Sequence, residues 1–285
     1  MNYQNDVMKC LYERASVRSF TDKEVTDEVL RSIIDAGCHG ATGGNLQPYS
    51  IIEIRSQEKK QALMDTGTMQ PIVKNAPVNL LFCIDWHRIE NWAKANKAPY
   101  VLRESYRHFW IAFQDTIIAA QNICTAADSL GLGSVYIGTV ESCFDELRPM
   151  FNLPEGVFPV VILSLGYPTK YPETASKLLY DDIVHHEEYQ SQDNQTVNAM
   201  MERKYGASKT PLSQRNLETL HKTTKNVHGK EYADNAIDYA KNLGHIHTVQ
   251  RYFGLHYVAD EVRTGNKAFL NSLRKAGFEW LDKDY

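Results

Sequence analysis

Apolar side chains recur at helical spacing in two parts of the chain. Residues 26–36 begin with Thr26, a residue type that caps helix N-termini, and stop before Gly37; the apolar positions between them are Val29, Leu30, Ile33 and Ile34. Residues 106–130 carry a broad apolar face made of Phe109, Trp110, Phe113, Ile117, Ala120, Ile123, Cys124 and Ala127. The pattern predicts a helix packed on a core at 26–36 and the central helix of the fold at 106–130.

Three short apolar runs rich in β-branched residues have a different pattern. They are SIIEI at 50–54, VNLLFCI at 78–84 and VVILSLG at 160–166. Continuous apolar runs of this length are typical of strands that are buried on both faces. Strands separated by helices predict an α/β or α+β architecture.

The character of the chain changes after about residue 190. The polar stretch SQDNQTVN, residues 191–198, predicts a linker, and helical patterns follow at 233–243 and at 266–278, where Gly277 ends the second pattern. We therefore predict two domains, residues 1–189 and a helical extension, residues 190–285. The aromatic content of the extension is too high for a disordered tail. We predict that its helices pack on the core, where they could wrap a partner subunit or cover a ligand pocket; the alternative is a separate appended module.

Composition limits the class of protein. Of the 285 residues 43% are hydrophobic and 23% are charged, and the formal net charge is -4. No block of five basic residues is present, so nucleic acid is not an expected partner. The N-terminal stretch has no apolar signal region, and no run approaches the roughly 18 apolar residues of a membrane span. We expect a cytoplasmic protein with no membrane partner.

Cysteine and histidine spacing does not indicate a metal site. The five cysteines are widely spaced and form no CxxC pair, which argues against a zinc ribbon or a redox dithiol and favours reduced, mostly buried thiols. Histidines gather at 185–186 and at 245–256, but without HExxH or a similar ligand spacing. Surface or packing roles are the expectation for them.

The stretch YERASVRSF, residues 12–20, places Arg14, Ser16 and Arg18 at alternate positions. These side chains share a face only if the backbone is extended, because the same spacing on a helix spreads them around the axis. Two guanidinium groups beside a hydroxyl suit a phosphate, which accepts several charge-assisted hydrogen bonds at once. The alternative interpretation is a solvated basic edge with an unrelated serine.

Two glycine-containing stretches are further candidates. HGATGGNLQPYS, residues 39–50, predicts a tight turn between a helix and a strand, in which Thr42, Asn45 and Gln47 are free to present polar groups. GLGSVYIG, residues 131–138, is not a dinucleotide fingerprint, because its third glycine position is Tyr136 and it follows a helix rather than a strand. We interpret it as a loop that ends a helix and lets a flat ligand approach its backbone.

Together these motifs resemble those of the nitroreductase family of FMN-dependent oxidoreductases. The matching order is RxSxR near the N-terminus, a helix, a turn similar to PSSxNxQPW, a central helix ending in GLGxxxxG, and a strand ending in LGYP, over roughly residues 8–188. The resemblance implies an α+β fold in which helices flank a central, mostly antiparallel sheet. It also implies a homodimer that binds FMN and uses NADH or NADPH as reductant.

The resemblance assigns cofactor-binding roles to residues of this chain. The triplet Arg14, Ser16 and Arg18 would bind the FMN phosphate, and Lys177 is the nearest match to a basic residue that completes the site. Tyr136, Ile137 and Gly138 match the loop beside flavin N5, where a backbone N–H is the expected donor.

The turn at 41–45 matches a segment that reaches the flavin of the other subunit. Thr42, Gly43 and Asn45 are its expected cofactor contacts. The sequence departs from the family pattern here, because Ala41, Thr42 and Gly43 replace a proline and two serines, and Tyr49 replaces a tryptophan. Thr42 keeps a hydroxyl, whereas Gly43 leaves only backbone.

The implied reaction is hydride transfer from NAD(P)H through flavin N5 to a small oxidised acceptor, nitroaromatic or quinone-like, by a ping-pong mechanism. No catalytic acid-base pair is expected, because the chemistry is centred on the flavin. Three alternatives remain at this point. A reductive dehalogenase of the same fold would need a substrate lid, for which Glu90, Lys94, Lys97, Tyr100 and Glu104 are suggestive only in composition. A flavin-consuming enzyme and a non-enzymatic flavin-binding or regulatory module are the others.

Overall fold

A computed structural model describes residues 3–206 and 208–280. The chain divides into two compact units, of which the second is Ala175–Ala268 and the first contains the residues before and after it. The boundary predicted after residue 189 lies inside the second unit, and the division into independently folding domains stays a prediction. Each unit is described below by itself.

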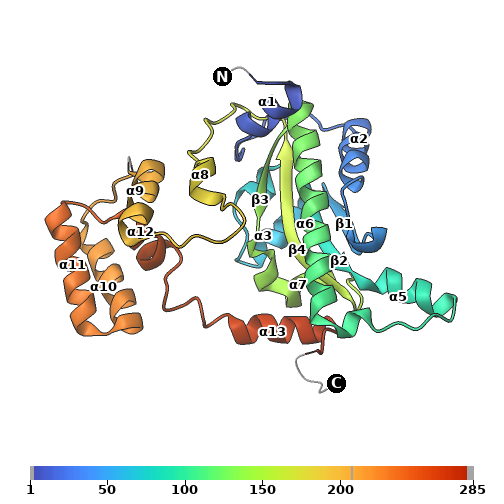
Figure 1. The fold of residues 1–285 in the computed structure, drawn as a ribbon. Coiled ribbons are helices and arrows are strands. Elements are labelled where there is room, and N and C mark those ends of the chain that lie inside the picture. Colours follow the sequence, from blue (N-terminus) through green and yellow to red (C-terminus); the bar gives the residue numbers. More distant parts are fainter. Residues whose placement is uncertain (1–2, 207, 281–285) are drawn as a thin grey trace. The chain divides into compact units, whose positions relative to one another are not determined.

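The first unit is built on a four-stranded antiparallel sheet (Figure 1). Its strands, in the order β1-β2-β4-β3, are β1 (Tyr49–Ile54), β2 (Val78–Asp85), β4 (Val157–Gly166) and β3 (Gly133–Ile137). The central strands β2 and β4 are buried along their whole length. The three predicted strands are therefore confirmed, and the antiparallel pairing with flanking helices confirms the α+β class. Burial on both faces was expected for all three strands, but β1 lies at the edge of the sheet and is mostly only partly buried.

The fourth strand, β3, corrects the sequence interpretation. Residues 131–138 were expected to form a loop, but Gly133–Ile137 pair with Ile162–Gly166 of β4. Val135, Tyr136 and Ile137 have high strand propensity, whereas Gly133 has low strand propensity. The glycines at 131, 133 and 138 suggested a loop, but the segment pairs with the fully buried strand β4.

Helices cover both faces of the sheet (Figure 1). Alternate residues of β2, such as Leu80 and Phe82, join the cluster that contains the apolar face of α6 (Tyr106–Ser129). Leu81 and Cys83, on the opposite face, pack with α3 (Gln57–Asp65), α4 (Ile72–Asn75) and α7 (Phe144–Met150). This alternation follows from the two-residue period of a strand.

The central helix α6 forms where the sequence predicts it. The side chain of Ser105 caps its N-terminus by accepting from the His108 N–H at 3.4 Å. Helix α2 (Asp27–Cys38), which Thr26 caps, packs against it at Gly37, where a Cβ would lie 2.0 Å from Cγ1 of Ile123. The remaining helices of this unit before residue 175 are α1 (Asp6–Glu13) and α5 (Trp86–Ala95).

Residues from Phe269 onward return to the first unit. Helix α13 (Asn266–Lys275) contributes Leu273 to the same cluster as α6, and Phe278 lies there with 1% of its surface exposed. The Phe278 ring meets Phe109 edge-to-face, with the centroids 5.2 Å apart. Leu273 and Phe278 of the predicted extension are thus part of the main core.

The second unit is helical, as expected for the extension. It contains α8 (Tyr180–Ile183), α9 (Asn194–Tyr205), α10 (Gln214–His228), α11 (Lys230–Leu243), α12 (Thr248–Arg251) and a π-helical turn at Tyr252–His256. Helix α9 begins inside the stretch predicted as a linker, because Asp193 caps it by accepting from the Thr196 N–H at 2.8 Å. The polar composition there reflects an exposed helix.

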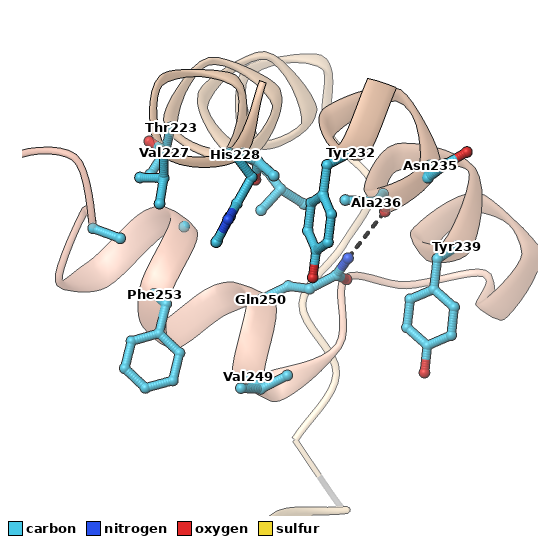
Figure 2. Close-up of a pocket in the computed structure, with 14 residues that line it drawn as sticks. Thr223, Val227, His228, Tyr232, Asn235, Ala236, Tyr239, Val249, Gln250 and Phe253 are labelled. Carbon is cyan, nitrogen blue, oxygen red and sulfur yellow. Dashed lines mark hydrogen bonds between the residues drawn. The ribbon is translucent and has the colours of Figure 1, made fainter. Parts of the chain in front are cut away.

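A cavity of about 480 Å³ lies within the second unit, between α10, α11 and the segment that contains α12 (Figure 2). Its lining is mostly apolar and includes Val227, Tyr232 and Phe253. The Gln250 amide at this cavity donates to Ala236 O at 2.9 Å, so this polar group fixes α12 to α11.

None of the helices in residues 3–206 and 208–280 is long and apolar enough to cross a membrane. The same residues contain no group of three or more His, Cys, Asp or Glu side chains arranged to hold a metal ion.

Candidate functional site

The triplet Arg14, Ser16 and Arg18 lies on an extended segment beside β3. Ser16 forms a parallel bridge with Ser134, and the Val17 N–H donates to Ser134 O at 2.9 Å. The alternate residues Ala15 and Val17 are buried, whereas the triplet is half-buried or exposed. The extended backbone that the spacing required is present, and it places all three polar side chains on one face.

The buried carboxylate of Asp128 forms an ion pair with Arg14. Arg14 Nε lies 3.2 Å from the Cys124 sulfur and 3.8 Å from Oδ2 of Asp128, both on the last turns of α6. The Asp128 side chain is only 5% exposed, and burial raises its pKa to about 6, although the nearby Arg14 opposes this shift. Its Oδ1 has no hydrogen-bond partner within the described part of the chain.

Arg14 lines a cavity of about 800 Å³ together with Asp128 and Tyr171. Ser16 and Arg18 do not line this cavity. No hydrogen-bond partner occupies Nη1 or Nη2 of Arg14 among the described residues. Because Nε is held and the terminal nitrogens are free, the fork is suited to bind an anion with two parallel hydrogen bonds.

Arg18 is exposed, and it makes only a long contact. Its Nη1 lies 3.5 Å from Ser16 O, and no carboxylate pairs with it in residues 3–206 and 208–280. The cation therefore remains available to an anionic ligand on the same face as Arg14.

The predicted N5 segment lies on the strand that pairs with the triplet. Ser134, the partner of Ser16, lies in β3 together with Tyr136 and Ile137, and Gly138 is the first residue after this strand. Ile137 is buried, and the Tyr136 hydroxyl donates to Gln121 Oε1 at 3.4 Å. Gly138 is exposed, with no atom within 4 Å of the position of a Cβ. The structure thus brings the triplet to the same edge of the sheet as an open backbone position.

The turn after α2 has a strained backbone. It contains a 3₁₀ turn at Gly43–Asn45, and the non-glycine residues Asn45 and Gln47 have φ angles of 55° and 48°. Thr42 Oγ1 accepts from the Gln47 N–H at 3.3 Å, and the Gln47 amide donates to Cys38 O at 2.9 Å. Gln47 was expected to be free to present its polar group, but its amide is used in a hydrogen bond within the turn. Gly43 and Asn45 are exposed.

The turn is attached to the core by Asp115 of α6. The Gly43 N–H donates to both oxygens of this carboxylate, at 3.1 and 3.0 Å. Asp115 is 4% exposed; burial raises its pKa, and the bond from Gly43 opposes the shift.

Lys177 belongs to the second unit, so its place in the phosphate site stays a prediction. The sequence analysis also missed Asp115 and Asp128. Both are acidic residues on the central helix, where neighbouring positions are apolar. An acidic residue among apolar positions is unusual, and this was the only signal in the sequence that could have revealed them.

Comparison with known proteins places these features in a family. A model described as the nitroreductase family matches residues 11–167. An NADPH-flavin oxidoreductase of Vibrio harveyi is 32% identical over 72% of this chain and 85% of its own. An FMN reductase [NAD(P)H] of Bacillus subtilis is 32% identical over 67% of this chain and 78% of its own.

Two solved structures are similar as well. One is the NADPH:FMN oxidoreductase from Vibrio harveyi complexed with NAD+, with a TM-score of 0.64 and 30% identity over 71% of this chain and 87% of its own. The other is B. megaterium NfrA2, with a TM-score of 0.70 and 26% identity over 96% of this chain and 98% of its own. Because the second match covers so much of the chain, it includes most of the helical residues after Thr174.

Proposed function

We propose that this chain, which belongs to the nitroreductase family, is an FMN-dependent oxidoreductase. It takes hydride from NADH or NADPH and reduces a small oxidised acceptor, nitroaromatic or quinone-like. The observation that carries the proposal is the extended face with Arg14, Ser16 and Arg18. The printed names of the relatives, an NADPH-flavin oxidoreductase and an FMN reductase, support the choice of cofactor and reductant.

The residues present fit the phosphate of FMN. Arg14 has its terminal nitrogens free beside a cavity, and Arg18 presents a second unpaired cation among the described residues. A phosphate accepts several charge-assisted hydrogen bonds, and a bidentate arginine contact also fixes its orientation. Lys177 is proposed as a third cation at this phosphate.

The open position at Gly138 fits a flat ring system. A side chain at this residue would occupy the space in front of the backbone, and glycine leaves that space empty. Tyr136, Ile137 and Gly138 would present backbone N–H groups to the ring near N5. When bound, FMN supplies the hydride chemistry, whereas the protein orients the reactants and excludes competing groups.

The turn at 42–45 supports a homodimer with flavins at the subunit interface. Asp115, which holds the turn, and Asp128, which holds Arg14, are both on α6, and the helical rise places them about 20 Å apart along the axis. This separation favours a turn that contacts the flavin bound by the other subunit. Thr42, Gly43 and Asn45 are the proposed contacts.

A shared site for reductant and acceptor implies ping-pong kinetics. The nicotinamide must leave before the acceptor can occupy the same face of the ring. No acid-base pair of this chain is required for the hydride step itself.

The dehalogenase alternative has less support. Glu90 pairs with Lys94 at 2.6 Å and with Arg103 at 3.4 Å, and the Tyr100 hydroxyl donates to Trp86 O at 3.4 Å. These side chains stabilise the protein's own structure, and a zwitterionic substrate would have to displace those contacts.

The test begins with the absorbance spectrum of the purified protein, alone and after incubation with FMN. Flavin bands are expected, followed by steady oxidation of NADH or NADPH with a quinone or a nitroarene. Parallel lines in double-reciprocal plots would support the ping-pong order. A protein that remains colourless with excess FMN contradicts the proposal, and a yellow protein without reductase activity favours the binding module.

A further inference from the structure

Asp115 is a buried carboxylate without a cationic partner among the described residues. It lies in the middle of α6 with 4% of its surface exposed, and its only hydrogen bonds within the described residues come from the Gly43 N–H, at 3.1 and 3.0 Å. Burying a charge without a counter-ion is costly. A leucine or alanine would suit the apolar surroundings better, so the position of the carboxylate calls for a role outside the core.

The turn that Asp115 holds needs an external anchor. Gly44, Asn45 and Gln47 all have positive φ angles, of 60°, 55° and 48°. For the two non-glycine residues this region of backbone space is sterically unfavourable. Such a conformation persists only when the surrounding contacts fix it.

Gly43 can be held only through its backbone. A Cβ at this position would lie 2.8 Å from Cγ2 of Ile111, so a larger residue would push the turn away from α6. The N–H of Gly43 is thus at the point of closest approach between the turn and the helix. Both carboxylate oxygens of Asp115 accept from this N–H and so connect the turn to the helix.

We propose that Asp115 is a positioning residue that fixes the 42–45 turn where it contacts the flavin ring. The inference rests on the proposed function, because the contact with the ring is part of that proposal. Asp115 acts through Gly43 and touches no reacting atom. Its removal should therefore weaken binding of the ring and leave binding of the phosphate unchanged.

The experiment measures FMN and riboflavin affinities of the full-length protein by flavin fluorescence quenching, together with the Tm of each variant. Asp115→Leu keeps the helix and the buried volume but cannot accept from Gly43. We expect both affinities to fall by at least about tenfold and by the same factor. Asp115→Asn can still accept from Gly43 through its amide oxygen, and it should bind both flavins within about threefold of the parent protein.

Thr116→Val is the matched control. Thr116 is the next residue of α6 and is fully buried, and its hydroxyl donates to Ala112 O within the helix. Its replacement disturbs the same part of the core without touching the turn, so flavin affinity should not change. Should the leucine variant fail to fold, Asp115→Ala takes its place in the comparison.

The outcomes separate the inference from its premise. If Asp115→Leu changes flavin affinity no more than Thr116→Val, or lowers only the Tm, the carboxylate is structural and the inference is wrong. If Asp115→Asn binds as poorly as Asp115→Leu, the hydrogen bond is not what positions the turn. A selective loss for FMN would place Asp115 at the phosphate instead. A parent protein that binds neither flavin overturns the proposed function and this inference with it.

Discussion

Gly133 and Val17 meet where the triplet segment lies against β3. A Cβ on Gly133 would be 2.3 Å from Cγ2 of Val17, which is almost completely buried. The extended segment 14–18 can therefore approach β3 only because a glycine is present at this point. The same approach permits the bond from the Val17 N–H to Ser134 O and sets the face on which Arg14 and Arg18 lie.

Gly133→Ala should destabilise the protein by about 1–3 kcal/mol, because the added methyl overpacks a buried contact that cannot relax freely. Urea denaturation of both proteins measures the change. Gly138→Ala is the control for stability, because its φ of −85° suits alanine and no atom lies within 4 Å of the new Cβ. An alanine at 133 that is as harmless as one at 138 would contradict the packing argument.

This contact also explains where sequence interpretation succeeded and where it failed. The runs at 50–54, 78–84 and 160–166 are mostly apolar and contain β-branched residues, so their pattern identified them as strands. In GLGSVYIG, Gly133 permits a close approach by Val17, which is distant in sequence. Local propensity cannot show a tertiary contact of this kind, and the segment was interpreted as a loop.

The last helix is a second case of a distant contact. Residues 266–278 have a helical pattern, but nothing in that pattern shows that Phe278 packs against Phe109 rather than within the extension. Asp115 and Asp128 were missed for a related reason. The periodicity of α6 defines its apolar face. The roles of the two acidic residues become visible only in the folded chain, where Asp115 accepts from Gly43 and Asp128 lies beside Arg14.

Phe278→Ala should lower the free energy of unfolding by about 3–5 kcal/mol, because it removes a fully buried aromatic ring. The loss should appear as a lower midpoint of urea denaturation. Phe253→Ala is the comparison: this ring is 57% exposed in the second unit, and its removal should change stability by no more than about 0.5 kcal/mol. Equal effects of the two substitutions would mean that the C-terminal segment does not belong to the main core.

Asp128 predicts a pH dependence of stability. Burial raises its pKa from 3.8 to about 6, so the folded protein retains a proton that the unfolded chain loses. Protonated Asp128 therefore contributes stability that is full below pH 3.8 and is lost as the pH rises through about 6. The Asp128→Asn variant should not lose this stability as the pH rises, because asparagine does not ionise.

The Tm difference between Asp128→Asn and the parent, without flavin, should thus be more favourable to the variant at about pH 7.5 than at about pH 5. After allowance for partial solvation, we expect a change of about 2–6 °C between the two conditions. Asp22→Asn, at an exposed residue, removes the same formal charge and should show no such change. A Tm difference that does not vary with pH would mean that Asp128 is ionised at both values.

Arg18→Ala tests the phosphate role of the triplet most directly. Arg18 is exposed, and its only hydrogen bond within the described part of the chain is the 3.5 Å one to Ser16 O, so its removal should have little effect on the fold. A charge-assisted hydrogen bond to a phosphate is worth about 1.5–3 kcal/mol. FMN affinity should therefore fall by about tenfold to a hundredfold.

Riboflavin and a second arginine provide the controls for Arg18→Ala. Riboflavin has no phosphate, so its affinity should be lower than that of FMN in the parent protein and should not change on substitution. Arg31→Ala removes an exposed arginine of α2, outside the triplet, and should leave both affinities unchanged.

Saturating FMN should restore most of the reductase rate of Arg18→Ala, because the phosphate is remote from the reacting end of the flavin. Equal losses for FMN and riboflavin would show that Arg18 supports the protein's own structure, and residues 14–18 would then be a solvated basic edge.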